Sequence, residues 1–130
     1  MVPSRRPPHT ISPFILGGSS GVRQLTTDGG PPLGAIEAFR YPIDHDRLEP
    51  GEVLLLYTDG VTEAENANHA LYGRSRLAEA LASTPAKDAR DLVTGIFDDV
   101  RRFVGEAEAA DDITVLALRR AVNVPVPSVR

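Results

Sequence analysis

Apolar residues are spaced differently in successive parts of the chain, and this spacing predicts where strands and helices lie. A continuous apolar run from Val53 to Leu56, followed by Asp59-Gly60, is typical of a strand buried on both faces. A second apolar run, from Ile113 to Leu118, predicts another strand near the end of the chain. Between the two runs, apolar residues recur at the spacing of amphipathic helices.

The part of the chain before Val53 predicts three shorter strands. Phe14 to Leu16 and Val22 to Leu25 flank the glycine-rich residues 17–21, a pattern that indicates a hairpin. Apolar and polar residues alternate from Phe39 to Ile43, which predicts a strand. Because Pro42 has no backbone N–H to donate, that strand is expected at the edge of the sheet or at a bulge.

Two helices are predicted between the long apolar runs. The first covers about Arg74 to Ala82. The second starts with Thr84 as its N-cap and Pro85 in its first helical position, and Gly105 ends it. Its apolar positions share one face at helical spacing: Leu92, Val93, Ile96, Phe97, Val100, Phe103 and Val104.

Strands followed by two helices and a last strand predict an α+β fold, an antiparallel sheet with both helices on one face. The last strand must return to the sheet after the helices. This return is expected to bring Asp111 close to the sheet end where Asp59 lies.

Composition restricts the function more than the fold. A chain of 130 residues has the size of one domain, and its net charge of −4 argues against a nucleic-acid partner. Because there is no cysteine, disulfides, thiolate metal sites and cysteine nucleophiles are excluded. The apolar runs are too short for a membrane span, and the proline- and arginine-rich residues 1–8 lack a signal-peptide core behind them. A cytoplasmic protein without a membrane partner is therefore expected.

Acidic residues stand at the ends of both long strands. Asp59 follows the first strand, and Asp111-Asp112 precede the second. Carboxylates on rigid strand ends are the oxygen ligands that hard divalent cations need. Taken alone, Asp59-Gly60 could equally be an ordinary turn, since this dipeptide is common in turns.

Together, these motifs resemble a known family. The segment Leu55 to Ala64 (LLYTDGVTEA), followed by Leu71-Tyr72-Gly73 and then by Asp111 to Thr114 (DDIT), resembles the metal-dependent PPM-type protein phosphatases in their SpoIIE-like or RsbU-like branch. The loop Gly30 to Ala35 and the segment His9 to Leu16 also look like segments of that branch. The resemblance extends over residues 9–120. The proline- and arginine-rich residues 1–8 are interpreted as a disordered lead-in, and residues 121–130, with Pro125 and Pro127, as a flexible tail.

The resemblance implies the C-terminal part of a PPM-type αββα sandwich and a serine/threonine phosphatase. In such enzymes two Mn2+ or Mg2+ ions activate a water that attacks the phosphorus of a phosphoprotein. Carried over by motif position, Asp59 and Asp111 are the expected metal ligands, with Asp112 and Gly60 in supporting roles and no catalytic residue beyond the ligands. Gly60 is expected to let the chain turn sharply beside the metals, where a side chain would crowd them. The substrate that the resemblance implies is an anti-anti-sigma (STAS) protein in bacterial sigma-factor partner switching.

One departure from the family keeps other interpretations open. The family's first metal-binding motif, similar to DVSGHG, is absent from these residues. The chain could therefore act as a non-catalytic module that binds a regulatory protein, or be a fragment whose gene start was placed too late. Whether a homodimer covers the sheet face exposed by the missing half is also left open.

Overall fold

The computed structural model describes residues 12–17, 21–25, 31, 33–83, 88–107 and 112–122. The predicted lead-in, most of the predicted tail, His9 and Asp111 lie outside the described residues.

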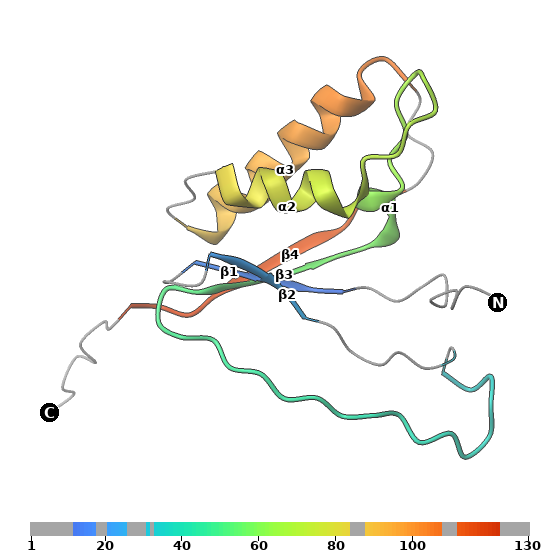
Figure 1. Cartoon of the computed structure of the whole chain (residues 1–130), viewed down its shortest axis with the longest axis vertical. Helices are drawn as coiled ribbons and strands as arrows, with labels where there is room; N and C mark the ends of the chain where they lie inside the picture. The colour runs from blue at the N-terminus through green and yellow to red at the C-terminus, as the bar shows by residue number, and fades with distance from the viewer. Residues whose placement is uncertain are drawn as a thin grey trace, which may run out of the picture.

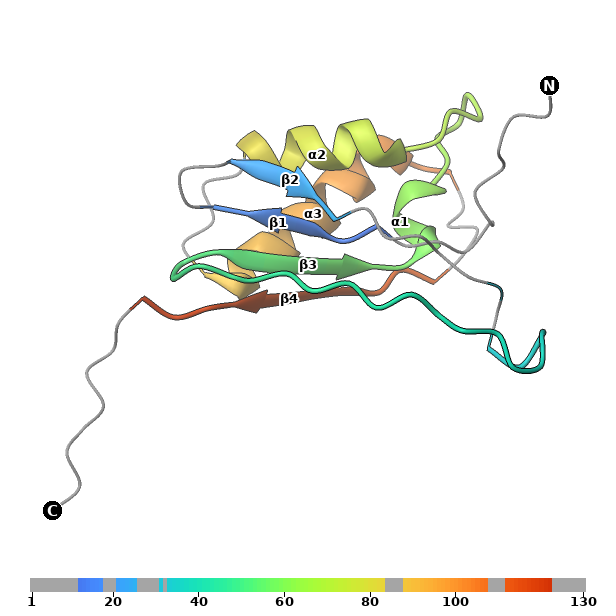
Figure 2. The same ribbon diagram turned by 60° about the horizontal axis from the view of Figure 1, so that its bottom comes forward.

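A four-stranded antiparallel sheet forms the centre of the molecule, with the strand order β2-β1-β3-β4 (Figure 2). The strands are β1 (Phe14–Leu16), β2 (Val22–Gln24), β3 (Val53–Tyr57) and β4 (Val115–Arg119). The hairpin of β1 and β2 was predicted and is confirmed. The last strand does return to the sheet after the helices, and it pairs with β3 from Val53↔Arg119 to Tyr57↔Val115.

Three helices lie on one side of this sheet (Figure 1). They are α1 (Asp59–Thr62), α2 (Gly73–Ser83) and α3 (Ala89–Val104). The predicted α+β arrangement of an antiparallel sheet with helices on one face is therefore confirmed. The short helix α1 was not predicted.

The long helices differ from their predictions mainly at one end. Helix α2 agrees with the predicted range to within one residue at each end. Helix α3 is capped by Asp88, whose side chain accepts the amide of Asp91 at 2.8 Å, and not by Thr84 as predicted. Thr84 and Pro85 lie outside the described residues. Gly105 ends α3 as expected, in a positive-φ conformation that favours glycine.

The hydrophobic core lies between the sheet and the helices. Alternate residues of β3, Val53, Leu55 and Tyr57, face the helices and are buried. The rest of the core comes from β1, α1, the loop before α2 and the two long helices: Phe14, Leu16, Val61, Tyr72, Leu77, Leu81, Leu92, Ile96 and Val100. The apolar stripe predicted for the second helix is therefore a packing surface.

The other face of the sheet is less covered, so the prediction that β3 is buried on both faces is wrong. Leu54 is only partly buried, and Leu56 is 38% exposed. On β4, Leu116 and Leu118 on the same face are 54% and 55% exposed. Among the described residues, the helix-covered face of β3 is thus more fully buried than the outer face.

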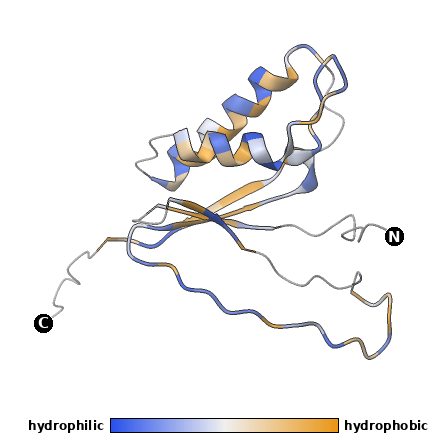
Figure 3. Cartoon of the chain, in the orientation of Figure 1, coloured by the Kyte–Doolittle hydropathy of each residue, from blue (hydrophilic) through white to orange (hydrophobic). Residues whose placement is uncertain are grey.

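A long segment without regular structure, residues 33–50, crosses the side of the sheet opposite the helices; we call it the strap (Figure 1, Figure 2). The strand predicted from Phe39 to Ile43 within it does not form. The backbone there pairs with no strand, and Pro42 supplies no amide for a ladder. Hydrophobic positions are scattered along the strap between hydrophilic ones (Figure 3).

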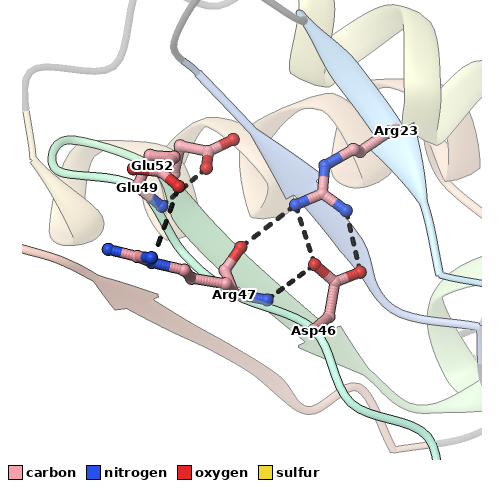
Figure 4. A network of polar contacts seen from close by, with 5 residues as sticks. All are labelled: Arg23, Asp46, Arg47, Glu49 and Glu52. Atoms are coloured by element: carbon pink, nitrogen blue, oxygen red, sulfur yellow. Dashed lines mark hydrogen bonds and ion pairs between the residues drawn. The ribbon is translucent and has the colours of Figure 1, made fainter.

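Polar contacts attach the end of the strap to the sheet (Figure 4). The Arg23 guanidinium on β2 donates to both carboxylate oxygens of Asp46, at 2.8 and 3.1 Å, and to the Arg47 carbonyl at 3.2 Å. Arg120 donates to the Leu48 carbonyl at 2.7 Å. The hydrogen bond from Arg23 holds the pKa of Asp46 below its ordinary value.

Candidate metal centre

The chain leaves β3 directly into α1, and this change of direction places Asp59. Asp59 is the first residue of α1, is partly buried, and accepts the amide of Glu63 through its carbonyl at 2.8 Å. The following residues, Gly60 and Val61, are buried. Asp59 therefore sits at the rim of the core, where the apolar strand ends.

Gly60 packs against the backbone that leads into β4. A Cβ atom built at Gly60 would lie 2.0 Å from the carbonyl oxygen of Asp112 and 3.5 Å from the Cα of Ile113. No side chain fits in this space. The φ angle of Gly60 is not positive, so the close approach of the Asp112 backbone is what requires glycine here.

The same contact joins the two acidic motifs. Asp59 neighbours Gly60, and Gly60 touches the backbone of Asp112, so both motifs lie at the same end of the sheet. The amide of Thr58 also donates to the carbonyl of Thr114 at 3.0 Å. Asp111 lies outside the described residues, and its role as a ligand stays a prediction, as do the roles of Asp59, Asp112 and Gly60.

The carboxylates that are described supply only part of a metal site. Among the described residues, no group of three or more His, Asp or Glu side chains is placed to hold one ion. Asp59 and Asp112 have the hard oxygen donors that Mn2+ or Mg2+ prefers. The donor type fits such a metal, which commonly binds one or two carboxylates and keeps several waters.

The histidines and the neighbouring glutamates do not extend this donor set. His45 is exposed in the strap. His69 is exposed and contacts Glu65 in the loop between α1 and α2. Glu63 caps the end of α1 with its backbone and is exposed.

The structural role of Tyr72 was missed in the sequence, although this residue belongs to the Leu71-Tyr72-Gly73 motif. Its amide donates to the Ala64 carbonyl at 2.7 Å, and its hydroxyl donates to Asp99 Oδ2 on α3 at 2.5 Å. Its ring packs edge-on against Phe103. Burial, and then the hydrogen bond to Asp99, raise the pKa of Tyr72. These contacts fix the loop after α1 to the helix layer.

Comparison with known proteins places this fold in a class. The solved phosphatase domain of the cell fate determinant SpoIIE from Bacillus subtilis, in its manganese-presoaked form, superimposes with a TM-score of 0.67 at 19% identity. The match covers 92% of this chain and 50% of that domain. The fold is thus that of part of a PP2C-type phosphatase domain.

Sequence comparison then identifies the family. The family model for stage II sporulation protein E (SpoIIE) matches residues 9–121, and the chain belongs to this family. Protein IcfG of Synechocystis is 36% identical over 112 residues, 82% of this chain and 17% of that protein. Phosphoserine phosphatase RsbU of Bacillus subtilis is 30% identical over 90 residues, 69% of this chain and 26% of that protein. The chain spans about a quarter or less of these relatives, and the predicted family resemblance is confirmed.

Proposed function

We propose that this chain forms the C-terminal part of the catalytic site of a metal-dependent protein phosphatase that acts on phosphoserine or phosphothreonine. The observation that carries the proposal is the contact of Gly60 with the Asp112 backbone, which brings the two acidic motifs together. Membership of a phosphatase family supports it, as does the relative that is named a phosphoserine phosphatase.

In this proposal the residues of the chain hold and orient the metal site. Asp59 and Asp111 would supply oxygen ligands to Mn2+ or Mg2+, with Asp112 supporting the site. Bound ions of this kind activate a water and stabilise charge on a phosphoryl group. Gly60 keeps the space between α1 and the Asp112 backbone free of a side chain. The expected substrate is a phosphorylated anti-anti-sigma protein of the STAS type, in the cytoplasm.

Removal of one ligand tests this function. Asp59→Asn should reduce manganese-dependent hydrolysis of a phosphoserine protein by at least about 100-fold, beyond the roughly 10–100-fold typical of groups that only support a ligand. The matched control is Asp98→Asn on the exposed surface of α3, which should hydrolyse at the wild-type rate. A wild-type chain no more active than Asp59→Asn at saturating manganese would refute catalysis by this chain.

A second candidate function follows from the lack of a DVSGHG-like motif in these residues. The chain would then bind a regulatory protein without turnover. Calorimetry with a STAS-domain protein distinguishes the two, because partner binding should then be unchanged by chelation of metal and by Asp59→Asn. A strict metal requirement for that binding would favour the phosphatase.

No helix among the described residues has the length and apolar character needed to cross a membrane.

A further inference from the structure

The candidate metal centre lies beyond the last regular pair of β3 and β4. That pair is Tyr57 with Val115. Asp59 lies two residues after Tyr57 at the end of β3, and Asp112 lies three residues before Val115 at the start of β4. Beyond this pair, the segment after β3 turns into α1, and the segment before β4, residues 112–114, has no regular structure. The strand ladder therefore does not by itself fix the separation of Asp59 from Asp112.

Thr58 extends the pairing by one step with its side chain. Its amide donates to the Thr114 carbonyl at 3.0 Å, and its hydroxyl oxygen Oγ1 accepts the Thr114 amide at 3.1 Å. In a regular antiparallel pair, a backbone carbonyl would accept that amide. The Thr58 carbonyl is already used, because it accepts the amide of Val61 in the first turn of α1 at 3.0 Å. The hydroxyl thus replaces a carbonyl that the turn into α1 has taken away.

This use of the hydroxyl differs from the usual role of a threonine at the start of a helix. Thr58 is the N-cap of α1, where a threonine oxygen normally accepts an amide of the first helical turn. Here the side chain makes no capping hydrogen bond. Its oxygen instead accepts the amide of Thr114, which directly precedes β4. Thr58 therefore joins the end of β3 to the start of β4, next to the two acidic motifs.

Gly60 fixes the same junction from the other side of Asp59. Its Cα lies so close to the Asp112 carbonyl that no Cβ could be inserted. Asp59 is therefore flanked by two residues, Thr58 and Gly60, that each contact the segment 112–114.

We propose that Thr58 is a positioning residue of the metal centre, whose hydroxyl holds the segment before β4 against the end of β3 and so sets the separation of the two acidic motifs. The proposal rests on the function proposed above. It assigns to Thr58 a role that acts on the cation through Asp59 and Asp112 and not by direct contact.

Two hydroxyl-free variants and one conservative variant test the role on the full chain. Thr58→Val keeps the shape of the side chain and removes the acceptor, Thr58→Ala removes it in a smaller side chain, and Thr58→Ser retains it. Thr94→Val, at an exposed position of α3, controls for the same chemical change elsewhere.

Amide hydrogen exchange measured by NMR gives the first readout. Loss of the acceptor should accelerate exchange of the Thr114 amide by roughly tenfold in the valine and alanine variants, and the serine variant should exchange as the wild type does. The Leu118 amide, which pairs with Leu54 in the regular part of the β3–β4 ladder, should be unaffected. Unchanged exchange at Thr114 in both hydroxyl-free variants would overturn the proposal.

Manganese affinity, measured by paramagnetic broadening of the Gly60 and Asp112 amides, gives the second readout. The hydroxyl-free variants should bind Mn2+ about tenfold more weakly, in the range of groups that orient metal ligands, and serine should restore the affinity. Wild-type affinity in Thr58→Val with accelerated Thr114 exchange would reduce Thr58 to a purely structural role and overturn the proposal. If the wild-type chain binds no manganese, the proposed function fails, and hydrogen exchange still decides whether Thr58 positions the segment.

Discussion

The two faces of the central sheet differ in what covers them, although both are built mainly from apolar residues. On the helix side, Leu55 is fully buried beneath α2 and α3. On the opposite side, Leu56 of the same strand is 38% exposed, and its neighbour Leu116 on β4 is 54% exposed. The comparison teaches that the helix face holds most of the buried core. On the outer face Ile15 is buried, whereas Leu56 and Leu116 stay partly exposed among the described residues.

The outer face also reaches the candidate metal centre. An apolar hollow of about 360 Å3 on it is lined by Pro13, Leu56, Tyr57, Thr58, Thr114 and Leu116. Thr58 and Thr114 form the junction beside Asp59 and Asp112. Whatever packs on this hollow in a longer phosphatase domain would therefore contact the residues that hold the acidic motifs.

Two consecutive residues of β3 test the difference between the faces most directly. Leu55→Ala removes a fully buried side chain and should lower the free energy of unfolding by about 3–4 kcal/mol, because it leaves a cavity under the helices. Leu56→Ala should cost about 1 kcal/mol or less, because much of that side chain is already in water. Urea unfolding monitored by circular dichroism measures both. Equal losses would show that something covers the outer face in solution, as a homodimer would.

Tyr72 sharpens the comparison on the helix side, since it ties the loop after α1 to α3. Tyr72→Phe should cost about 1 kcal/mol, the usual value of a hydrogen bond whose acceptor keeps another partner. Asp99 keeps that partner, because Arg102 donates to it at 3.4 Å. Tyr41→Phe, in the exposed strap, is the matched control and should change stability less.

The raised pKa of Tyr72 also predicts how the stability of the wild-type protein depends on pH. An unfolded tyrosine ionises near its ordinary value of 10.0, whereas the folded protein keeps Tyr72 protonated to higher pH. The stabilisation is therefore complete below pH 10 and is lost as the pH rises toward the folded pKa. Burial also raises the pKa of Tyr57, so only Tyr57→Phe together with Tyr72→Phe should flatten the alkaline loss fully. An unchanged alkaline slope in the double variant would contradict this account.

The parts of the fold that were predictable are those with a local signal. Helix α2 and most of α3 follow from helical periodicity, and the apolar run of β3 indicated a strand. Helix α1 has only four residues, too few for any periodicity to show. The alternation from Phe39 to Ile43 predicted a strand, but a strand needs a partner, and none pairs with the strap among the described residues.

The candidate metal centre, like the fold, has parts that the sequence predicts and parts that it does not. The motifs with Asp59 and Asp112 are visible in the sequence, and the order of elements predicts that they meet. The role of the Thr58 hydroxyl is not visible, because its partner Thr114 lies 56 residues away and the need for it arises only when α1 takes the Thr58 carbonyl. The need for glycine at position 60 was expected, but its contact with the Asp112 backbone was not, since a close approach to a distant backbone leaves no local trace.

The smallest expected effect concerns the polar attachment of the strap to the outer face. Asp46→Asn weakens the pair with Arg23, an exposed ion pair of the kind that contributes little to stability. We expect no measurable change in the urea midpoint. Amide hydrogen exchange at residues 46–48 of the strap should be faster, because this pair attaches that part of the strap to β2. Because the pKa of Asp46 is lowered in the folded chain, its contribution is present above the unfolded value near 3.8 and is lost as the pH falls through the lower folded value. Wild-type exchange in the strap should therefore approach that of the variant only in acid. A large loss of global stability in Asp46→Asn would instead mean that the strap is part of the core, and that the outer face is closed by the chain itself.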